Sequence, residues 1–208
     1  MPLALLAALV LAPQATLYDV MRDGQKAGEA RLTQTMRRDG GKAVEMNMTL
    51  RAPDGRTVVT HTRSVYSSTG RPIRREQVTK LEVPRFEKSV TATFYEGGAN
   101  VVVVQAGKRT VRNVTLVKTA PLDSPSEFWF LRDRPRVGLT VVSYQLNLET
   151  LAWEPVRTTY QGRIRVQHGA QTVEAHKVES DKGVAFLDDT GIPLVIEAPP
   201  YRMERRID

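Results

Sequence analysis

The sequence contains no cysteine and only three histidines, His61, His168 and His176. Without cysteine the chain has no disulfide, no thiolate metal site and no cysteine nucleophile. No two histidines stand at a tight metal-binding spacing. His168 and His176 flank a turn at Gly169, where strand register is expected to separate them along the ladder. We therefore expect neither a metal ion nor a cofactor.

Long hydrophobic runs are also missing. The longest uncharged apolar run, Leu3–Ala12, has about ten residues, whereas a membrane-spanning helix needs roughly twenty. A run of this length close to Met1 is typical of a cleaved export signal. We predict that residues 1–15 are a signal peptide, that residues 16–208 form a single domain, and that the mature protein is secreted or periplasmic. The absence of cysteine favours a bacterial envelope, because disulfide frameworks are common in eukaryotic secreted proteins.

Hydrophobic residues make up 41% and charged residues 25% of the chain, which is ordinary globular usage and argues against disorder or a membrane bundle. The formal net charge is +7 and the isoelectric point is about 9.9, so anionic partners fit. In an exported protein these would be lipid head groups or acidic envelope polymers rather than nucleic acid. The basic clusters at 71–75 and 132–136 fit solvated strand and loop faces equally well.

The dominant pattern is a period of two. Val44, Met46, Met48 and Leu50 alternate with mostly polar residues, which predicts a strand with one buried face. Turn dipeptides such as Asp54-Gly55 separate further runs of this kind. Strands are expected at 27–36, 43–51, 57–66, 73–81, 88–95, 100–105, 110–117, 139–148, 153–161, 163–168, 171–179, 184–188 and 192–198. Antiparallel pairing of sequence neighbours is the economical topology.

One segment has a helical pattern. Ser124 suits the N-cap, Pro125 the first helical position and Glu127 the third position of a capping box. We predict a helix over 125–132, ending before Pro135. It carries four large apolar side chains: Phe128, Trp129, Phe130 and Leu131. This apolar load is too large for a free surface helix, so the helix should cover another part of the fold.

A dozen strands cannot stay in one flat open sheet. We predict a mainly all-β protein with a single curved antiparallel sheet, or half-barrel, and one short helix across its mouth. The concave apolar face would bind a ligand. Its expected lining comprises Phe128, Trp129 and Phe130 at the opening and, further in, Trp153, Phe94 and Met48. A sandwich of two sheets with the helix as an end cap is the alternative.

Catalytic patterns are scarce. Asp189-Thr190-Gly191 matches the tripeptide that aspartic proteases use, but that chemistry needs two carboxylates that share a proton, and the sequence has one copy. Its position between the runs 184–187 and 194–196 favours a turn. No Gly-x-Ser-x-Gly elbow is present. We therefore expect a protein that is not an enzyme.

Several segments resemble a group of exported bacterial proteins known as domains of unknown function. These segments are Tyr18-Asp19-Val20, the Gly24–Gly28 step, Gly70–Ile73, the helix at 125–132 and the closing stretch 187–194. The overall pattern is also similar to the curved half-barrels of periplasmic lipoprotein and lipid carriers. The resemblance implies a β-rich fold with a hydrophobic groove and supplies no functional residues.

These expectations combine into one functional hypothesis. The protein would be an exported, monomeric, non-enzymatic binding protein of the bacterial envelope, with no membrane span and no nucleic-acid partner. Its concave sheet would take a lipid, an acyl chain or an envelope protein. The alternative is an envelope scaffold that docks through a basic surface and has no ligand cavity.

Overall fold

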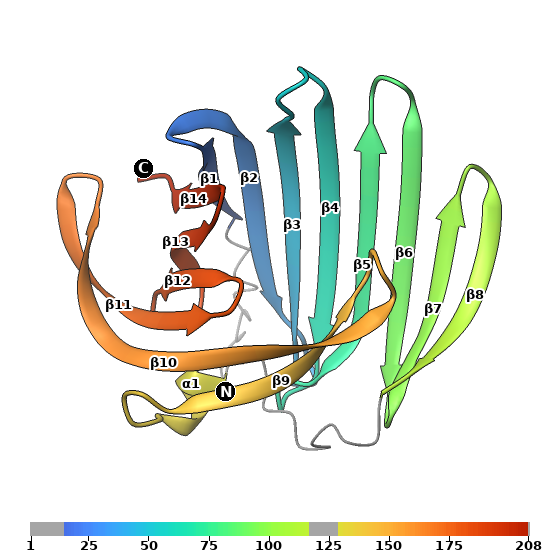
Figure 1. The fold of residues 1–208 in the computed structure, drawn as a ribbon. Helices are drawn as coiled ribbons and strands as arrows, with labels where there is room; N and C mark the ends of the chain where they lie inside the picture. Colours follow the sequence, from blue (N-terminus) through green and yellow to red (C-terminus); the bar gives the residue numbers. More distant parts are fainter. Residues whose placement is uncertain (1–14, 117–128, 208) are drawn as a thin grey trace, which may run out of the picture.

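The computed structural model describes residues 15–116 and 129–207. They form a mainly all-β fold with one short helix, as predicted (Figure 1). The first half contains β1 (Ala15–Arg22), β2 (Gln25–Met36), β3 (Lys42–Arg51), β4 (Thr57–Tyr66), β5 (Pro72–Leu81), β6 (Phe86–Tyr95), β7 (Gly98–Gln105) and β8 (Lys108–Thr115). The second half contains α1 (Trp129–Asp133), β9 (Thr140–Asn147), β10 (Ala152–His168), β11 (Gln171–Ser180), β12 (Gly183–Leu187), β13 (Pro193–Ala198) and β14 (Tyr201–Arg205).

All of these strands belong to one antiparallel sheet with the order β8-β7-β6-β5-β4-β3-β2-β1-β14-β13-β12-β11-β10-β9. Sequence neighbours pair throughout, except that β8 and β9 are the two edges and β1 pairs with β14. The sheet is curved and does not close, so the single-sheet prediction is confirmed and the two-sheet sandwich is wrong.

The predicted alternation in β3 sets the buried face of the sheet. Directly opposite residues of an antiparallel pair point to the same side. Met48 lies opposite Ala30, and Ala30 lies opposite Tyr18. A core cluster forms on this face, with Tyr18, Val20, Ala30 and Leu32 buried and Val44, Met46, Met48, Leu50, Ile192, Tyr201 and Met203 packed against them.

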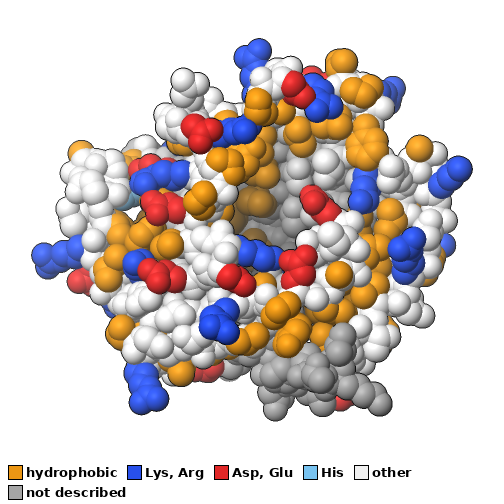
Figure 2. Space-filling view, in the orientation of Figure 1, with side chains coloured by type: hydrophobic (Ala, Val, Ile, Leu, Met, Phe, Trp, Pro, Cys, Tyr) orange, Lys and Arg blue, Asp and Glu red, His pale blue; other side chains and the backbone are white. Residues whose placement is uncertain are grey.

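The same face becomes polar in the next two strands. Met46 lies opposite Thr62 of β4, Thr62 opposite Gln77 of β5, and Gln77 opposite Val90 of β6. A polar stripe on β4 and β5 therefore separates the cluster around Tyr18 from a second cluster on β6 and β7. In Figure 2 this side of the molecule has a central hollow, with hydrophobic side chains on its wall and charged side chains around its opening.

The tip of the β9–β10 hairpin reaches across the hollow side of the sheet. Leu146 and Leu148 pack against buried residues of β6 and β7, namely Val90, Ala92, Ala99 and Val101. These contacts join strands that lie near opposite ends of the sheet order. The curl is therefore held by side-chain packing where backbone pairing is absent.

Three strands differ from the ranges expected from the period-two pattern. The first, β1, lies before all of these ranges. The runs at 153–161 and 163–168 form one continuous strand, β10, in which Gly162 has a positive φ of 91° at a register shift. A bulge of this type lets the hydrogen-bond ladder continue past the glycine. β14 was not predicted, because Tyr201–Arg205 is short, is rich in charge and follows Pro199-Pro200.

The helix and the tripeptide lie where the sequence placed them. The C-terminal part of the predicted helix is α1, while its N-cap residues and Phe128 lie outside the described residues. Asp189-Thr190-Gly191 forms the turn between β12 and β13, and the backbone N–H of Gly191 donates to Asp188 O at 2.9 Å. No helix in the described ranges is long and apolar enough to span a membrane.

Candidate functional site: a pocket between the helix and strands β9 to β13

Helix α1 is fixed to the sheet by aromatic packing. Trp129 and Phe130 are each only 4% exposed. The Phe130 ring stacks on Tyr160 of β10 with centroids 6.2 Å apart, and Trp129 meets Phe130 edge-on at 6.3 Å. Val178 of β11 and Leu187 of β12 complete this cluster. Buried aromatic pairs of this geometry contribute about 0.5–1.5 kcal/mol beyond area burial.

A cavity of about 420 Å³ adjoins this cluster. Its apolar lining comprises Trp129, Phe130, Val141, Val156, Val178, Val184, Ala185, Leu187, Ile196 and Ala198. Its polar lining comprises Ser143, Gln145, Thr158, Ser180, Lys182 and Glu197, together with Gly183. A few polar groups within a mainly apolar wall are the usual composition of a small-molecule site, and the volume lies in the lower part of the usual range.

The register of the strands orders these groups along the pocket. One row across the strands is apolar and consists of Tyr160, Val178, Ala185 and Ile196. The neighbouring row, closer to the β11–β12 turn, consists of Val141, Thr158, Ser180 and Gly183. The pocket is therefore apolar at the α1 end. At the other end, near the β11–β12 turn, Thr158, Ser180 and Lys182 lie beside Val141, and this end is called the polar end.

Lys182 supplies the positive charge at the polar end. It follows β11 in the β11–β12 turn, and its Nζ lies 2.9 Å from Glu154 Oε2. Asn147 Nδ2 donates to the other carboxylate oxygen of Glu154 at 2.6 Å. The hydrogen bond from Lys182 and then that from Asn147 lower the pKa of Glu154, so its carboxylate is ionised at neutral pH.

A hydrogen-bonded chain holds the apolar end in place. The hydroxyl of Tyr160 lies 2.9 Å from His176 Nδ1, and His176 Nε2 lies 3.1 Å from Asp189 Oδ1. Arg163 Nη2 donates to both carboxylate oxygens of Asp189 at 2.8 and 3.0 Å. Burial raises the pKa of Tyr160, so the phenol stays neutral near pH 7. The chain fixes the ring on which Phe130 stacks.

The described side chains among the six predicted to line a groove lie in separate places. Trp129 and Phe130 line the pocket together. Phe94 and Trp153 form an edge-on pair with centroids 6.0 Å apart in the cluster on β6 and β7. Met48 packs in the cluster around Tyr18, and Phe128 lies outside the described residues. A ligand role for these residues remains a prediction.

Sequence reasoning missed most of the pocket lining. Val141, Val156, Val178 and Ile196 each sit in a predicted strand, and their period-two positions were readable from the sequence. What the sequence lacks is the register that aligns β9 to β13. The sequence therefore indicated which face each residue lies on, but not that these residues line one pocket.

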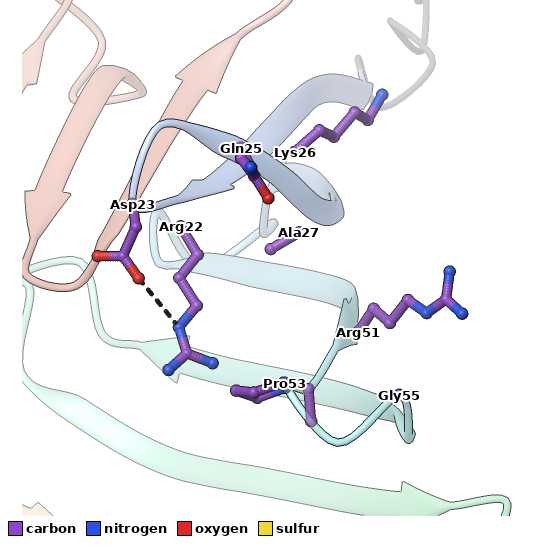
Figure 3. A pocket seen from close by; sticks show the side chains of 9 residues that line it. Arg22, Asp23, Gln25, Lys26, Ala27, Arg51, Pro53 and Gly55 are labelled. Atoms are coloured by element: carbon purple, nitrogen blue, oxygen red, sulfur yellow. Dashed lines mark ion pairs between the residues drawn. The ribbon is translucent and has the colours of Figure 1, made fainter.

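A second cavity, of about 510 Å³, lies at the ends of the β1–β2 and β3–β4 hairpins. Three cations line it, but Figure 3 shows that they do not converge. Arg22 points toward Pro53 and pairs with Asp23 at 3.6 Å, while Lys26 and Arg51 extend away from the cavity. This arrangement lacks the convergent donors of an anion site.

The histidines have protein partners. His61 Nδ1 lies 2.7 Å from Asn47 Oδ1, and His168 Nε2 lies 2.7 Å from Arg205 O. Over residues 15–116 and 129–207, no three acidic or histidine side chains group in a way that could hold a metal ion. Every buried side-chain polar atom in these ranges has a hydrogen-bond partner.

The fold and the pocket define a class: an open, barrel-like antiparallel sheet with an amphipathic cavity beneath a short helix. No protein-family model and no curated protein matches the chain. A crystal structure of a β-barrel-like protein of domain of unknown function DUF1849, from Brucella abortus, is similar over 94% of this chain and 95% of that chain. The TM-score is 0.61 and the sequence identity is 11%, so the two proteins share a fold.

A second crystal structure is more distant. It is a DUF1089 family protein from Pseudomonas aeruginosa, with a TM-score of 0.41 and 10% identity over 82% of this chain and 89% of that chain. A TM-score of 0.41 is too low to support a conclusion about the fold. The barrel-like fold of the DUF1849 protein agrees with the curved half-barrel predicted from the sequence.

Proposed function

We propose that this protein is an exported, non-enzymatic binding protein of the bacterial cell envelope that holds an apolar ligand in the pocket between α1 and β9 to β13. The observation that carries the proposal is the apolar lining of a cavity of about 420 Å³ beneath Trp129 and Phe130. Burial of alkyl groups contributes about 0.8 kcal/mol per methylene, so one acyl chain provides useful affinity.

Native mass spectrometry with organic extraction tests this proposal. The mature chain is purified without harsh detergent from a host that exports it. We expect a stoichiometric lipid or other apolar adduct. A clean apo mass, together with no binding of added fatty acids or phospholipids, would overturn the proposal.

A filled-pocket variant locates the site. Ala185 lines the pocket between Val178 and Ile196, so Ala185→Phe should occupy the cavity and abolish retention of the adduct. Ala52→Phe is the matched control, because Ala52 lines the cavity of Figure 3 instead. Equal retention by both variants would place the ligand elsewhere.

The helix aromatics are tested separately. If Trp129 gates the pocket, Trp129→Ala should retain the fold and release ligand faster. Trp129 is only 4% exposed in a packed cluster, so unfolding of this variant would assign it to the core instead. Urea unfolding and ligand retention, measured on the same preparation, separate the two roles.

The basic edge strand β8 favours a second candidate function, docking on an anionic envelope surface. Lys108, Arg109 and Arg112 are all exposed there, and no carboxylate of the described residues lies within ion-pair distance of them. Cosedimentation with anionic vesicles should weaken steeply with salt and on replacing these three residues by glutamine. Salt-insensitive or absent cosedimentation would remove this candidate.

A further inference from the structure

The position of Lys182 indicates which kind of head group a ligand of the pocket carries. Resting on the proposed function, we propose that the ligand is a single-chain amphiphile with an anionic head group. Its tail lies at the apolar end against Trp129 and Phe130, and its head group lies at the polar end beside Lys182.

The polarity gradient supports an amphiphile. The row of Tyr160, Val178, Ala185 and Ile196 offers no hydrogen-bonding group to the pocket except the Tyr160 hydroxyl, which already lies 2.9 Å from His176 Nδ1. In the neighbouring row, the Ser180 hydroxyl donates to Gly183 O and accepts from the backbone N–H of Lys182, both at 3.2 Å. The Thr158 hydroxyl lines the pocket beside it. A wholly apolar ligand would take the water from the Thr158 hydroxyl without offering it a partner, which costs free energy.

The charges at the polar end support an anion. Lys182 is the cation among the residues that line the pocket, and its side chain is 56% exposed. Its ammonium has three donors, one of which is directed to Glu154. The acidic lining residue, Glu197, accepts a hydrogen bond from Arg202 Nη1 at 2.7 Å. Lys182 and Glu197 are thus each held in an ion pair, and Lys182 keeps two further N–H donors that an anionic head group can accept.

The size of the cavity supports one chain. A volume of about 420 Å³ lies in the lower part of the 300–1,000 Å³ range of ligand pockets. Two acyl chains of a bilayer phospholipid would need a larger site. A fatty acid and a lysophospholipid share the required chemistry, which is one chain and one anionic head group.

Two substitutions with opposite expected effects test the proposal. Lys182→Gln removes the cation and should weaken binding of palmitate about three- to fivefold, the range for a solvent-exposed ion pair. Glu154→Gln removes the competing carboxylate and should tighten palmitate binding by a similar factor. Both effects should shrink in high salt. Lys177→Gln is the matched control, because Lys177 pairs with Glu179 and does not line the pocket.

The choice of probe separates the possible failures. The neutral counterpart 1-monopalmitoylglycerol should bind equally to the wild type, Lys182→Gln and Glu154→Gln. Binding of lysophosphatidylglycerol distinguishes a phosphate from a carboxylate head group. If palmitate and the neutral lipid bind alike and Lys182→Gln changes neither, the head-group proposal is wrong while the apolar pocket stands. If no single-chain lipid binds at all, the proposed function itself fails.

Discussion

The indole Nε1 of Trp153 donates a hydrogen bond to the backbone carbonyl oxygen of Val114 at 3.2 Å. Trp153 belongs to β10 and Val114 to β8, which stand near opposite ends of the sheet order. The bond accompanies the edge-on contact between Trp153 and Phe94 of β6. A hydrogen bond to a carbonyl of an edge strand thus helps to hold an open sheet in its curled form.

Trp153 should therefore matter for stability in two separable ways. Trp153→Phe keeps an aromatic ring against Phe94 and loses the hydrogen bond, so it should cost about 1 kcal/mol of unfolding free energy. Trp153→Ala also loses the ring packing and should cost about 3 kcal/mol or more. Urea unfolding followed by circular dichroism measures both. Equal losses for the two variants would mean that the ring contributes nothing beyond its N–H.

Tyr18 should make the protein sensitive to alkali. Its side chain is fully buried and its hydroxyl donates to Pro193 O at 2.9 Å. Burial raises its pKa to about 12 from 10.0. The unfolded state therefore loses this proton first, and the stabilisation from Tyr18 is complete below pH 10 and is lost as the pH rises toward 12.

The comparison with Tyr18→Phe isolates this effect. The variant should be less stable than the wild type by about 1 kcal/mol of unfolding free energy at pH 7. Between pH 9 and 12 its unfolding free energy should fall less than that of the wild type, by up to about 2–3 kcal/mol. Tyr95→Phe is the control, because Tyr95 is 52% exposed. Parallel stability curves of wild type and Tyr18→Phe between pH 9 and 12 would contradict the prediction.

Asp188 should make the protein sensitive to acid. Burial alone would raise its pKa, but hydrogen bonds from the side chains of Thr190 and Arg205 and from the backbone N–H of Ile192 outweigh burial and lower the pKa. Because the pKa is lower in the folded state, the stabilisation is present above about pH 4 and is lost as the pH falls through the folded-state pKa.

Asp188→Asn tests that contribution. Arg205 Nη2 donates to the ionised Oδ2 of Asp188 at 2.7 Å. The asparagine amide has no charged oxygen for this bond, so the variant should lose about 2 kcal/mol of unfolding free energy at pH 7. Its stability should fall less steeply below pH 4 than that of the wild type. Asp54→Asn, in an exposed turn, should change the acid limb less. An Asp188→Asn curve as steep as that of the wild type would assign the acid loss to other groups.

Gly28 should be irreplaceable for a reason different from turn geometry. A Cβ at this position would lie 1.9 Å from the backbone oxygen of Thr49 and 3.0 Å from Leu50 Cα. These are backbone atoms of the paired strand β3, which cannot move without weakening the ladder. Gly28→Ala should therefore cost about 2 kcal/mol or more. Gly55→Ala, where φ is +82° but space is open, should cost about 1 kcal/mol. The opposite order in thermal unfolding would contradict this argument.

Much of the fold was readable from the sequence because alternation and turn chemistry are local. Val44 to Leu50 showed which residues of β3 face the core, and Asp54-Gly55 marked the turn after it. The prediction of two strands separated at Gly162 was wrong because it also used only local sequence. A glycine with positive φ looks like a turn, and only the partner strand β11 shows that the ladder continues past it.

The candidate site was less predictable, because it depends on contacts between distant segments. The composition of the 125–132 segment indicated that it covers something apolar, and Trp129 and Phe130 do line the pocket. The polar end of the pocket depends on Thr158 lying opposite Ser180, and such register cannot be read from either strand alone. The chain also gives no sign that Trp153 should meet Val114, 39 residues away.

Because β1 pairs with β14, the strands of the sheet form one continuous series of paired neighbours. If the sheet is followed from β9 through β14 into β1 and on to β8, each strand pairs with the next. A circular permutant that joins Arg206 to Leu17, whose backbone groups already hydrogen-bond at 2.8 Å, and opens the chain between β8 and β9 would have sequence-local pairing throughout. In the natural chain, the pairing of β1 with β14 in the middle of the sheet joins the strands that are furthest apart in sequence. Because folding rates fall as contact order rises, the permutant should fold faster than the natural chain.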